Sequence, residues 1–514
     1  MLLGLCAAVG AVHCRADLSL DMSHSEAGTP GTSGSGGAGI ASGGAAGAGR
    51  SGGGRGNGAG RSGQGGTGYA GAGAGTGGGA GTTTTAGAGD APDHGGSGGE
   101  GGSEEGGRGE SGSGGEAGAV ASPCDCGSNA TLTALDCKPD VYYNAWLSDD
   151  GSVVLYMRVD SSIYSSNYDA GLWTLEQGTI YRAHRLPQGL SADGKTALFA
   201  TMQGLPVLRT LAGRDTVLSQ LSLGDYLSRD GVTVVGRVET SSGEQIVTWT
   251  AAGGVVTPDF GIEQKGVYAM VYALNPDASV LAGSHATGFD DAGNPLDYLP
   301  FVWTAAGGAH IIATPPPPVP NADWYGAVTA LSDDGSVAVG TLANGVVTNN
   351  PVPYLYDLFR WTEAQGITDL GPCRIADIHG GCDGPVWVSG DGSVAAFTNA
   401  IAEGAMIGKA FRWTNGEKTD IAPNDYALVR GMSADGNVIV GSLQDLDTAV
   451  TTTPFVWTTT DGNQDLAARI ESAGADLSGW TLGETVSISR DGRVLVGNGT
   501  CHGMPALYRA YLPR

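Results

Sequence analysis

The sequence has few basic side chains and no long apolar run after its first 12 residues. Because a membrane-spanning helix needs about 18 or more apolar residues, nothing beyond the N-terminus is expected to cross a membrane. Lysine and arginine number 26 against 52 aspartate and glutamate, which gives a net charge of −26. This acidity disfavours nucleic acid and anionic membrane surfaces as partners, because both carry charge of the same sign.

Motifs for catalysis and metal binding are also missing. No H-E-x-x-H occurs, and G-x-S-x-G is found only around Ser51 and Ser97, in Gly-rich sequence that generates the pattern by chance. A zinc site needs paired C-x-x-C elements with histidine support, which the cysteine spacings do not supply. The sequence therefore predicts no catalytic residue and no cofactor, and it disfavours an enzyme.

The first 16 residues are predicted to direct export. Met1–Val12 is apolar, as in the central region of a signal segment, although no basic region precedes it. Cys14 is a candidate lipidation site, but His13 stands where a bacterial lipobox carries a small residue. Cleavage after Ala16 is the alternative. Either route predicts an extracellular or cell-envelope location, with membrane attachment only through an N-terminal anchor.

Residues 17–122 are rich in Gly, Ser and Ala and are predicted to form a disordered linker. Glycine accounts for 90 of the 514 residues, and most of the excess lies in this segment. Such a segment cannot bury enough apolar surface to offset the loss of backbone entropy. Residues 123–514, by contrast, carry recurring Val, Leu, Trp and Tyr and form the predicted globular domain.

An internal repeat dominates residues 123–514. A short turn element with Asp at a fixed place occurs eight times, at spacings of 43, 37, 47, 57, 57, 44 and 56 residues. Gly follows this Asp in every copy except the fourth, where Ala278 replaces it. Eight equivalent carboxylates indicate a role in turns, since one active site needs only one or two. The repeated residues are Asp150, Asp193, Asp230, Asp277, Asp334, Asp391, Asp435 and Asp491.

Each repeat predicts four strands: one before the turn, an alternating apolar strand after it, an aromatic strand such as Phe411–Thr414, and a short closing strand. A single sheet of this kind exposes both faces, whereas radial packing covers them. We therefore predict an all-β propeller of about eight four-stranded blades, with Trp side chains in the core between blades. Seven blades are the alternative, because the second and fourth repeats depart from the pattern at Leu208–Thr210 and Ala278.

An N-terminal strand is predicted to close the ring. The eighth repeat ends with its third strand, Ala506–Leu512, and Ala130–Cys137 resembles the missing fourth strand. Pairing the two would remove an open sheet edge. It would also bring Cys137 near Cys501, because the end of a fourth strand and the loop after a second strand lie on the same face.

The six cysteines of the globular part are expected to form disulfides, as an even number in an exported chain indicates. We predict the bonds Cys137–Cys501 and Cys373–Cys382, the second of which brackets a single loop. Cys124 and Cys126 then remain without an assigned partner. They either form a strained disulfide with one another or take part in an alternative set of disulfide pairings.

The elements S-x-D-G-x-V-x-V-G and F-x-W-T, together with Ala475–Leu482 leading into Ile488–Gly492, resemble the HAF-repeat family of extracellular proteins. The resemblance covers residues 141–512. It implies a repeat architecture and an extracellular location, but no reaction or ligand, because the family is mainly a structural label.

One acidic loop stands apart from the repeat. Asp290, Asp291 and Asp297 offer carboxylate oxygens that suit Ca²⁺, while a solvated loop without metal is the favoured alternative.

Two functional hypotheses follow. The favoured one is a monomeric, non-enzymatic structural or binding module at the cell surface, whose partner is a surface protein or a glycan. The alternative is a glycan-binding or glycoside-cleaving propeller. An enzyme should gather two or more carboxylates and a base or arginine in the central channel or on one face. A channel lined only by Val, Ser and Gly would exclude it.

The first prediction concerns ring closure by a disulfide. Non-reducing peptide mapping should recover Cys137 and Cys501 in one cross-linked peptide that separates on reduction. A free Cys501, or Cys501 bonded to another cysteine, would contradict the predicted pairing.

Overall fold

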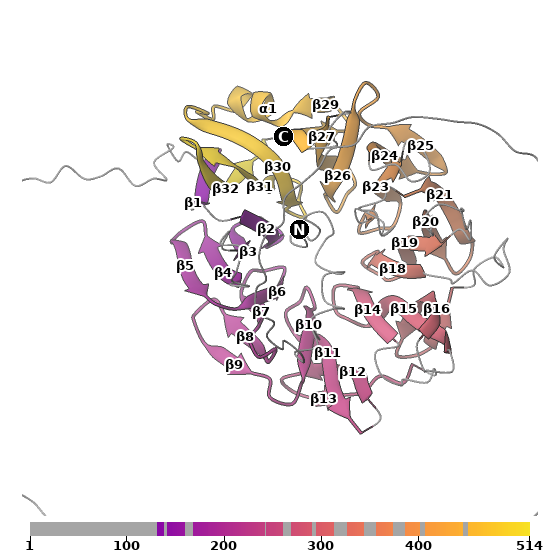
Figure 1. Cartoon of the computed structure of the whole chain (residues 1–514). Helices are drawn as coiled ribbons and strands as arrows, with labels where there is room; N and C mark the ends of the chain where they lie inside the picture. The colour runs from indigo at the N-terminus through magenta and orange to yellow at the C-terminus, as the bar shows by residue number, and fades with distance from the viewer. Residues whose placement is uncertain are drawn as a thin grey trace, which may run out of the picture. The chain divides into compact units, whose positions relative to one another are not determined.

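The computed structural model describes residues 131–137, 141–159, 168–241, 243–260, 269–289, 295–312, 326–343, 356–373, 386–400, 407–445 and 451–513. These residues form eight four-stranded antiparallel sheets around a common axis, an eight-bladed β-propeller (Figure 1). The predicted fold is confirmed, with eight blades and not the alternative seven. The proposed export segment, residues 1–16, and linker, residues 17–122, lie outside the described residues.

The first four blades follow one another in the sequence. Blade 1 contains β2 (Val141–Leu147), β3 (Val153–Val159), β4 (Tyr168–Thr174) and β5 (Gly178–Ala183). Blade 2 contains β6 (Leu186–Leu190), β7 (Thr196–Ala200), β8 (Pro206–Thr210) and β9 (Asp215–Val217). Blade 3 contains β10 (Leu223–Leu227), β11 (Thr233–Thr240), β12 (Gly243–Thr250) and β13 (Gly254–Val256). Blade 4 contains β14 (Ala269–Leu274), β15 (Val280–Phe289), β16 (Pro295–Thr304) and β17 (Gly308–Ile311).

The second half of the ring continues the same order and ends with the closing strand. Blade 5 contains β18 (Gly326–Leu331), β19 (Val337–Ala343), β20 (Tyr356–Thr362) and β21 (Gly366–Pro372). Blade 6 contains β22 (Trp387–Val388), β23 (Val394–Ala400), β24 (Gly408–Thr414) and β25 (Glu417–Asp420). Blade 7 contains β26 (Tyr426–Met432), β27 (Val438–Gln444), β28 (Thr451–Thr458) and β29 (Gly462–Asp465). Blade 8 contains β30 (Trp480–Ile488), β31 (Val494–Cys501), β32 (Met504–Tyr511) and β1 (Leu132–Cys137).

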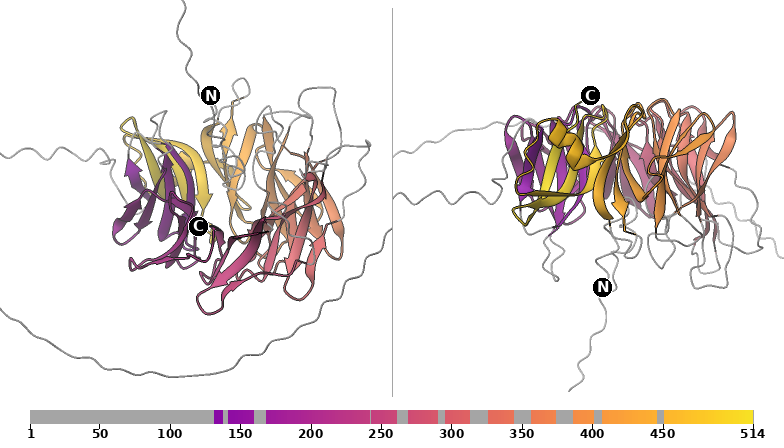
Figure 2. Two further views of the ribbon diagram at one scale, coloured as in Figure 1. Left: turned by 60° about the horizontal axis from the view of Figure 1, so that its bottom comes forward. Right: turned by 90° about the horizontal axis from the view of Figure 1, so that it is seen from above.

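The first strand of each repeat lies next to the axis, and the fourth lies at the periphery (Figure 1). The strands run between the two faces of the propeller (Figure 2). Since neighbouring strands are antiparallel, the Asp-Gly turns and the short turns between third and fourth strands lie on one face. We call this the tight-turn face.

The predicted ring closure is also confirmed. β1, the first described strand, pairs antiparallel with β32, the last, with Leu132 opposite Ala510 and Cys137 opposite Ala506. Blade 8 therefore takes its outermost strand from the beginning of the domain and its other three from the end. This arrangement leaves no gap in the ring between blade 8 and blade 1.

A shared hydrogen-bond pattern explains the recurrence of Ser and Asp in the turns. In blade 7, the Ser433 hydroxyl donates to Asp435 Oδ1 at 2.6 Å and accepts from the Val438 N–H at 3.0 Å. The Ser433 side chain is completely buried, so the partners replace its lost hydration. In the equivalent turn of blade 6, the Ser389 hydroxyl and the Ser393 N–H hold the pKa of Asp391 below its usual range. These contacts support the predicted turn role of the repeated Asp.

Glycine is favoured in these turns for two reasons. The seven turn glycines have φ between 65° and 74°, and Ala278 adopts the same left-handed conformation at 57°. Each turn also lies against the preceding blade: a Cβ on Gly436 would stand 2.7 Å from Cβ of Val394 in blade 6. The last contact closes the circle, because a Cβ on Gly151 of blade 1 would stand 2.4 Å from Cβ of Val494 in blade 8.

The tryptophans lie between blades, as predicted. Trp361 of blade 5 packs against Val302 of blade 4, and Trp303 of blade 4 packs against Val235 of blade 3, in continuous clusters of buried residues. Both indoles are 8% exposed. The third-strand Trp therefore forms part of the interface with the preceding blade.

An arginine on the third strand strengthens three of these interfaces. Arg412 of blade 6 lies with its guanidinium carbon 5.6 Å from the centroid of the Trp457 ring in blade 7, and its Nε donates to the Gly436 carbonyl at 3.2 Å. Arg509 does the same at the closing interface, on the Trp173 ring at 5.8 Å and the Gly151 carbonyl at 2.9 Å. Arg360 makes the corresponding contacts with blade 6.

A short helix, α1 (Leu466–Ser472), interrupts the connection from blade 7 to blade 8. The Asp465 side chain accepts a hydrogen bond from the Ala468 N–H at 2.8 Å and so caps its first turn. Leu466 and Ile470, one helical turn apart, are completely buried. The repeat pattern did not predict this helix. Among the described residues, no helix is long and apolar enough to cross a membrane.

The second prediction separates the two requirements for glycine. Gly436→Ala should lower the free energy of unfolding by about 1–2 kcal/mol for the left-handed backbone and by about 1–3 kcal/mol more for the clash with Val394. Gly462→Ala should incur only the backbone term, because its φ is 71° and no atom lies within 4 Å of its Cβ position. Urea unfolding measures both, and equal losses would contradict the close-approach argument.

Candidate functional site

A ring of hydrogen bonds joins the eight Asp-Gly turns around the axis. It involves the residue between Ser and Asp, here called the axial position. The Asp333 N–H donates to the Gly390 carbonyl at 2.8 Å. In the same way, the Gly390 N–H donates to the Ala434 carbonyl and the Ala434 N–H donates to the Arg490 carbonyl, both at 2.8 Å. The ring closes where the Asp491 N–H donates to the Asp149 carbonyl at 3.3 Å. The eight axial positions are Asp149, Ala192, Arg229, Pro276, Asp333, Gly390, Ala434 and Arg490.

The degenerate fourth turn keeps the ring complete by a substitute contact. Pro276 has no N–H, so it cannot donate to the next blade. Instead, Nδ2 of Asn275 donates to the Asp333 carbonyl at 3.4 Å, and the Pro276 carbonyl still accepts from the Asp230 N–H at 3.1 Å. Asn275 replaces the turn serine, and its Oδ1 accepts from the Val280 N–H at 2.8 Å.

Four charged side chains at axial positions form two ion pairs. Arg229 of blade 3 pairs with Asp149 of blade 1, and Arg490 of blade 8 pairs with Asp333 of blade 5. Main chains joined by such hydrogen bonds lie about 5 Å apart, so a ring of eight is only about 13 Å across. Long side chains from distant blades therefore meet at the axis. We call these four residues the axial charge cluster.

Small residues leave space for this cluster. A Cβ on Gly390 would stand 2.4 Å from Asp333 Oδ2 and 2.7 Å from Arg490 Nη2. Gly390 does not have a positive φ, so its backbone conformation does not require glycine. The absent side chain at this axial position is what allows the ion pair between blades 5 and 8.

The two ion pairs also influence one another. Burial and the neighbouring Arg490 lower the pKa of Arg229 to about 10, against an opposing effect of Asp333, so Arg229 remains protonated at neutral pH. The four side chains keep between 27% and 43% of their surface exposed. The axial charge cluster is thus electrostatically coupled and partly exposed to solvent.

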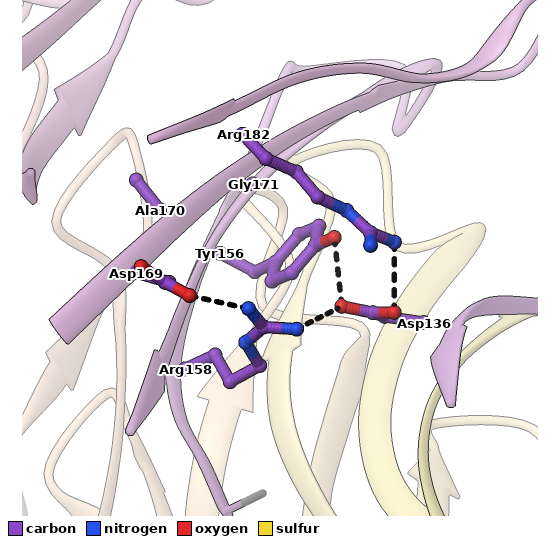
Figure 3. A pocket seen from close by; sticks show the side chains of 7 residues that line it. All are labelled: Asp136, Tyr156, Arg158, Asp169, Ala170, Gly171 and Arg182. Carbon is purple, nitrogen blue, oxygen red and sulfur yellow. Dashed lines mark hydrogen bonds and ion pairs between the residues drawn. The ribbon is translucent and has the colours of Figure 1, made fainter. Parts of the chain in front are cut away.

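A second charged cluster lies at the seam between blade 8 and blade 1 (Figure 3). Asp136 on β1 accepts hydrogen bonds from Arg182 at 2.9 Å, from the Tyr156 hydroxyl at 3.2 Å and from Arg158 at 3.5 Å. Arg158 also pairs with Asp169. A bulge at Leu135 shifts the register of β1 and lets both Leu135 and Asp136 be buried.

The centre of this seam cluster is buried, while Arg182 at its edge is 43% exposed. Asp136 is 4% exposed and Arg158 is 7% exposed. Burial and the Asp136 carboxylate raise the pKa of Tyr156 to about 12, so the phenol stays protonated and donates to Asp136. All the partners of Asp136 named here come from blade 1, whereas β1 belongs to the sheet of blade 8. The seam cluster therefore holds the closing strand to the neighbouring blade.

The structure describes three of the four cysteines in the two predicted disulfides. Cys137, Cys373 and Cys501 are each disulfide-bonded. Cys137 and Cys501 lie in one buried cluster with Ala506, as ring closure requires, while the pairing of their sulfurs stays a prediction. Cys382, the predicted partner of Cys373, lies outside the described residues.

The remaining candidate residues receive no structural support. Cys14, the lipidation candidate, and the calcium candidates Asp290 and Asp291 lie outside the described residues. Asp297 is in β16, opposite Gly288 of β15. Within the described ranges, no group of three His, Cys, Asp or Glu side chains is arranged to hold a metal ion.

The axial charge cluster was not predicted from the sequence. Its members occupy the variable position that directly precedes the repeated Asp of the turn. The detectable signal was the occurrence of a charged residue at this position in four of the eight turns. Nothing in the local sequence indicated that these four side chains would meet.

Comparisons with solved structures return β-propellers at low identity. The chain is 14% identical to TolB from Acinetobacter baumannii over 52% of this chain and 62% of that chain, with a TM-score of 0.33. It is 13% identical to an oligogalacturonate lyase in complex with manganese, over 75% of this chain and 94% of that chain, with a TM-score of 0.40. It is 10% identical to the β-propeller domain of the Trilobed protease from Pyrococcus furiosus, over 73% of this chain and 96% of that chain, with a TM-score of 0.36. No family model and no curated protein matches the chain.

The third prediction tests the seam cluster. Asp136→Asn should lower the free energy of unfolding by about 3–5 kcal/mol, because it removes one partner from a buried ionic network. Asp461→Asn is the matched control: it breaks the partly exposed pair with Arg469 and should cost less than about 1 kcal/mol. Urea unfolding midpoints compare the two, and similar small losses would contradict a closing role for Asp136.

Proposed function

We propose that the protein is an exported, non-enzymatic binding module at the cell surface, whose ligand or partner reaches it through the axial charge cluster. The export segment and the Gly-rich linker support the location, and the S-x-D-G and F-x-W-T elements support membership of the HAF-repeat family. The observation that carries the proposal is the pairing of both axial carboxylates with arginines, Asp149 with Arg229 and Asp333 with Arg490.

Glycoside hydrolysis by the usual mechanism needs two carboxyl groups in different states. One is a protonated acid with a raised pKa, and the other is a carboxylate that attacks the sugar or activates water. Asp149 and Asp333 each pair with an arginine of another blade, so the two carboxyl groups belong to separate ion pairs. This arrangement suits the binding of a charged or polar group better than a joint action of both carboxyl groups on one sugar.

A glycan-cleaving propeller is the second candidate, and one observation favours it. The axis is not lined by Val, Ser and Gly alone: two carboxylates and two arginines meet there. An enzyme that acts at the axis needs carboxylates and an arginine gathered there in this way.

The fourth prediction separates the two candidates. A glycan array and surface-protein fractions should reveal a ligand that the full chain binds without changing it, and no new reducing ends should appear on incubation with glycans. Asp149→Asn and Asp333→Asn should alter binding but reveal no turnover, since the proposed module has none. Release of reducing ends by the wild-type chain, abolished in either variant, would contradict the proposal and support the enzyme.

A further inference from the structure

We infer that the axial charge cluster binds an oxyanion, namely a carboxylate, sulfate or phosphate group, which Arg229 and Arg490 hold between them. This inference rests on the proposed binding function and specifies the chemistry of its ligand.

The fold does not require charge at the axial positions. Ala192, Gly390 and Ala434 take part in the same ring of backbone hydrogen bonds without any polar side chain. Partly exposed ion pairs such as these add at most about 1 kcal/mol to stability. Two arginines and two aspartates at these positions therefore indicate a use other than holding the blades together.

Two guanidinium groups close to one another favour an anion. Arg229 and Arg490 both extend into a ring only about 13 Å across, where they pair with Asp149 and Asp333. The like-charge repulsion between them also lowers the pKa of Arg229. An oxyanion between the two groups would relieve it. Each guanidinium carries five N–H donors, and its ion pair engages one nitrogen, Nη2. Donors suited to a second, bidentate acceptor are thus present on both arginines.

The two aspartates act as internal competitors for the arginines. The side chains of Asp149 and Asp333 keep 43% and 41% of their surface exposed, so each can turn toward solvent when a ligand displaces it. Neutralising an aspartate should accordingly strengthen anion binding, and neutralising an arginine should weaken it.

The fifth prediction uses defined anions as probes. Isothermal titration of the full chain at low ionic strength with inorganic phosphate, sulfate and glucuronate should detect binding, whereas glucose, the uncharged match of glucuronate, should not bind. Arg229→Gln and Arg490→Gln should each weaken the affinity by about 10- to 100-fold, as expected for loss of a charged hydrogen bond. Asp149→Asn and Asp333→Asn should raise it several-fold, as expected when a competing charge is removed.

Arg469→Gln is the matched control. Arg469 belongs to α1 at the periphery of the propeller and forms a partly exposed ion pair with Asp461 (Figure 1). Its substitution should leave anion affinity unchanged. Circular dichroism and thermal unfolding establish that each variant is folded, so that a loss of binding reports on the axis.

The outcomes distinguish this inference from the proposed function. Anion binding that survives Arg229→Gln and Arg490→Gln, or equal binding of glucose and glucuronate, would overturn the oxyanion site while leaving a binding module intact. Glycan turnover would instead overturn the proposed function. Binding of phosphate and sulfate without glucuronate would support the site and identify an inorganic or phosphoryl group, whereas preference for glucuronate would identify an acidic sugar.

Discussion

The close approach of each Asp-Gly turn to the preceding blade is the contact on which the rest of the propeller depends. In five of the described turns, a Cβ on the glycine would stand less than 3 Å from the first residue of the neighbouring second strand, as it would between Gly436 and Val394. This short distance sets the spacing of the blades. At that spacing the axial main chains can hydrogen-bond around the ring, and the third-strand Trp can fill the interface behind them.

The blades reach the same spacing by different side chains, which explains why the repeat tolerates variation. Arg412 bridges blades 6 and 7 by donating to the turn carbonyl and lying over Trp457. Blade 4 has Val302 at the corresponding position, in one buried cluster with Trp361. In the fourth turn, Ala278 adopts the left-handed conformation without glycine, and the Asn275 side chain replaces the missing backbone donor. The backbone arrangement is therefore constant while the side chains at many positions vary.

This freedom has a functional consequence at the axis. A position whose main chain completes the ring needs no particular side chain, so it can carry charge without loss of the fold. Arg229, Arg490, Asp149 and Asp333 use this freedom, and Gly390 provides the space for one of the two pairs. The seam cluster around Asp136 is different, because its burial and its position on the closing strand tie its charges to the integrity of the ring.

The sequence by itself determined the four-stranded repeat, its turns and the strand that closes the ring, while it left the number of blades at eight or seven. These features are encoded locally, since Ser433, Asp435 and Gly436 form one turn within a few residues and alternation specifies the strand that follows. Only the tertiary structure decided which charged side chains meet. Arg490 and Asp333 are 157 residues apart in the sequence. Their pairing depends on closure of the whole ring and on a ring diameter that two side chains can span. It also depends on the space that Gly390 leaves in blade 6. No local pattern carries such information, because it exists only once all eight blades surround one axis.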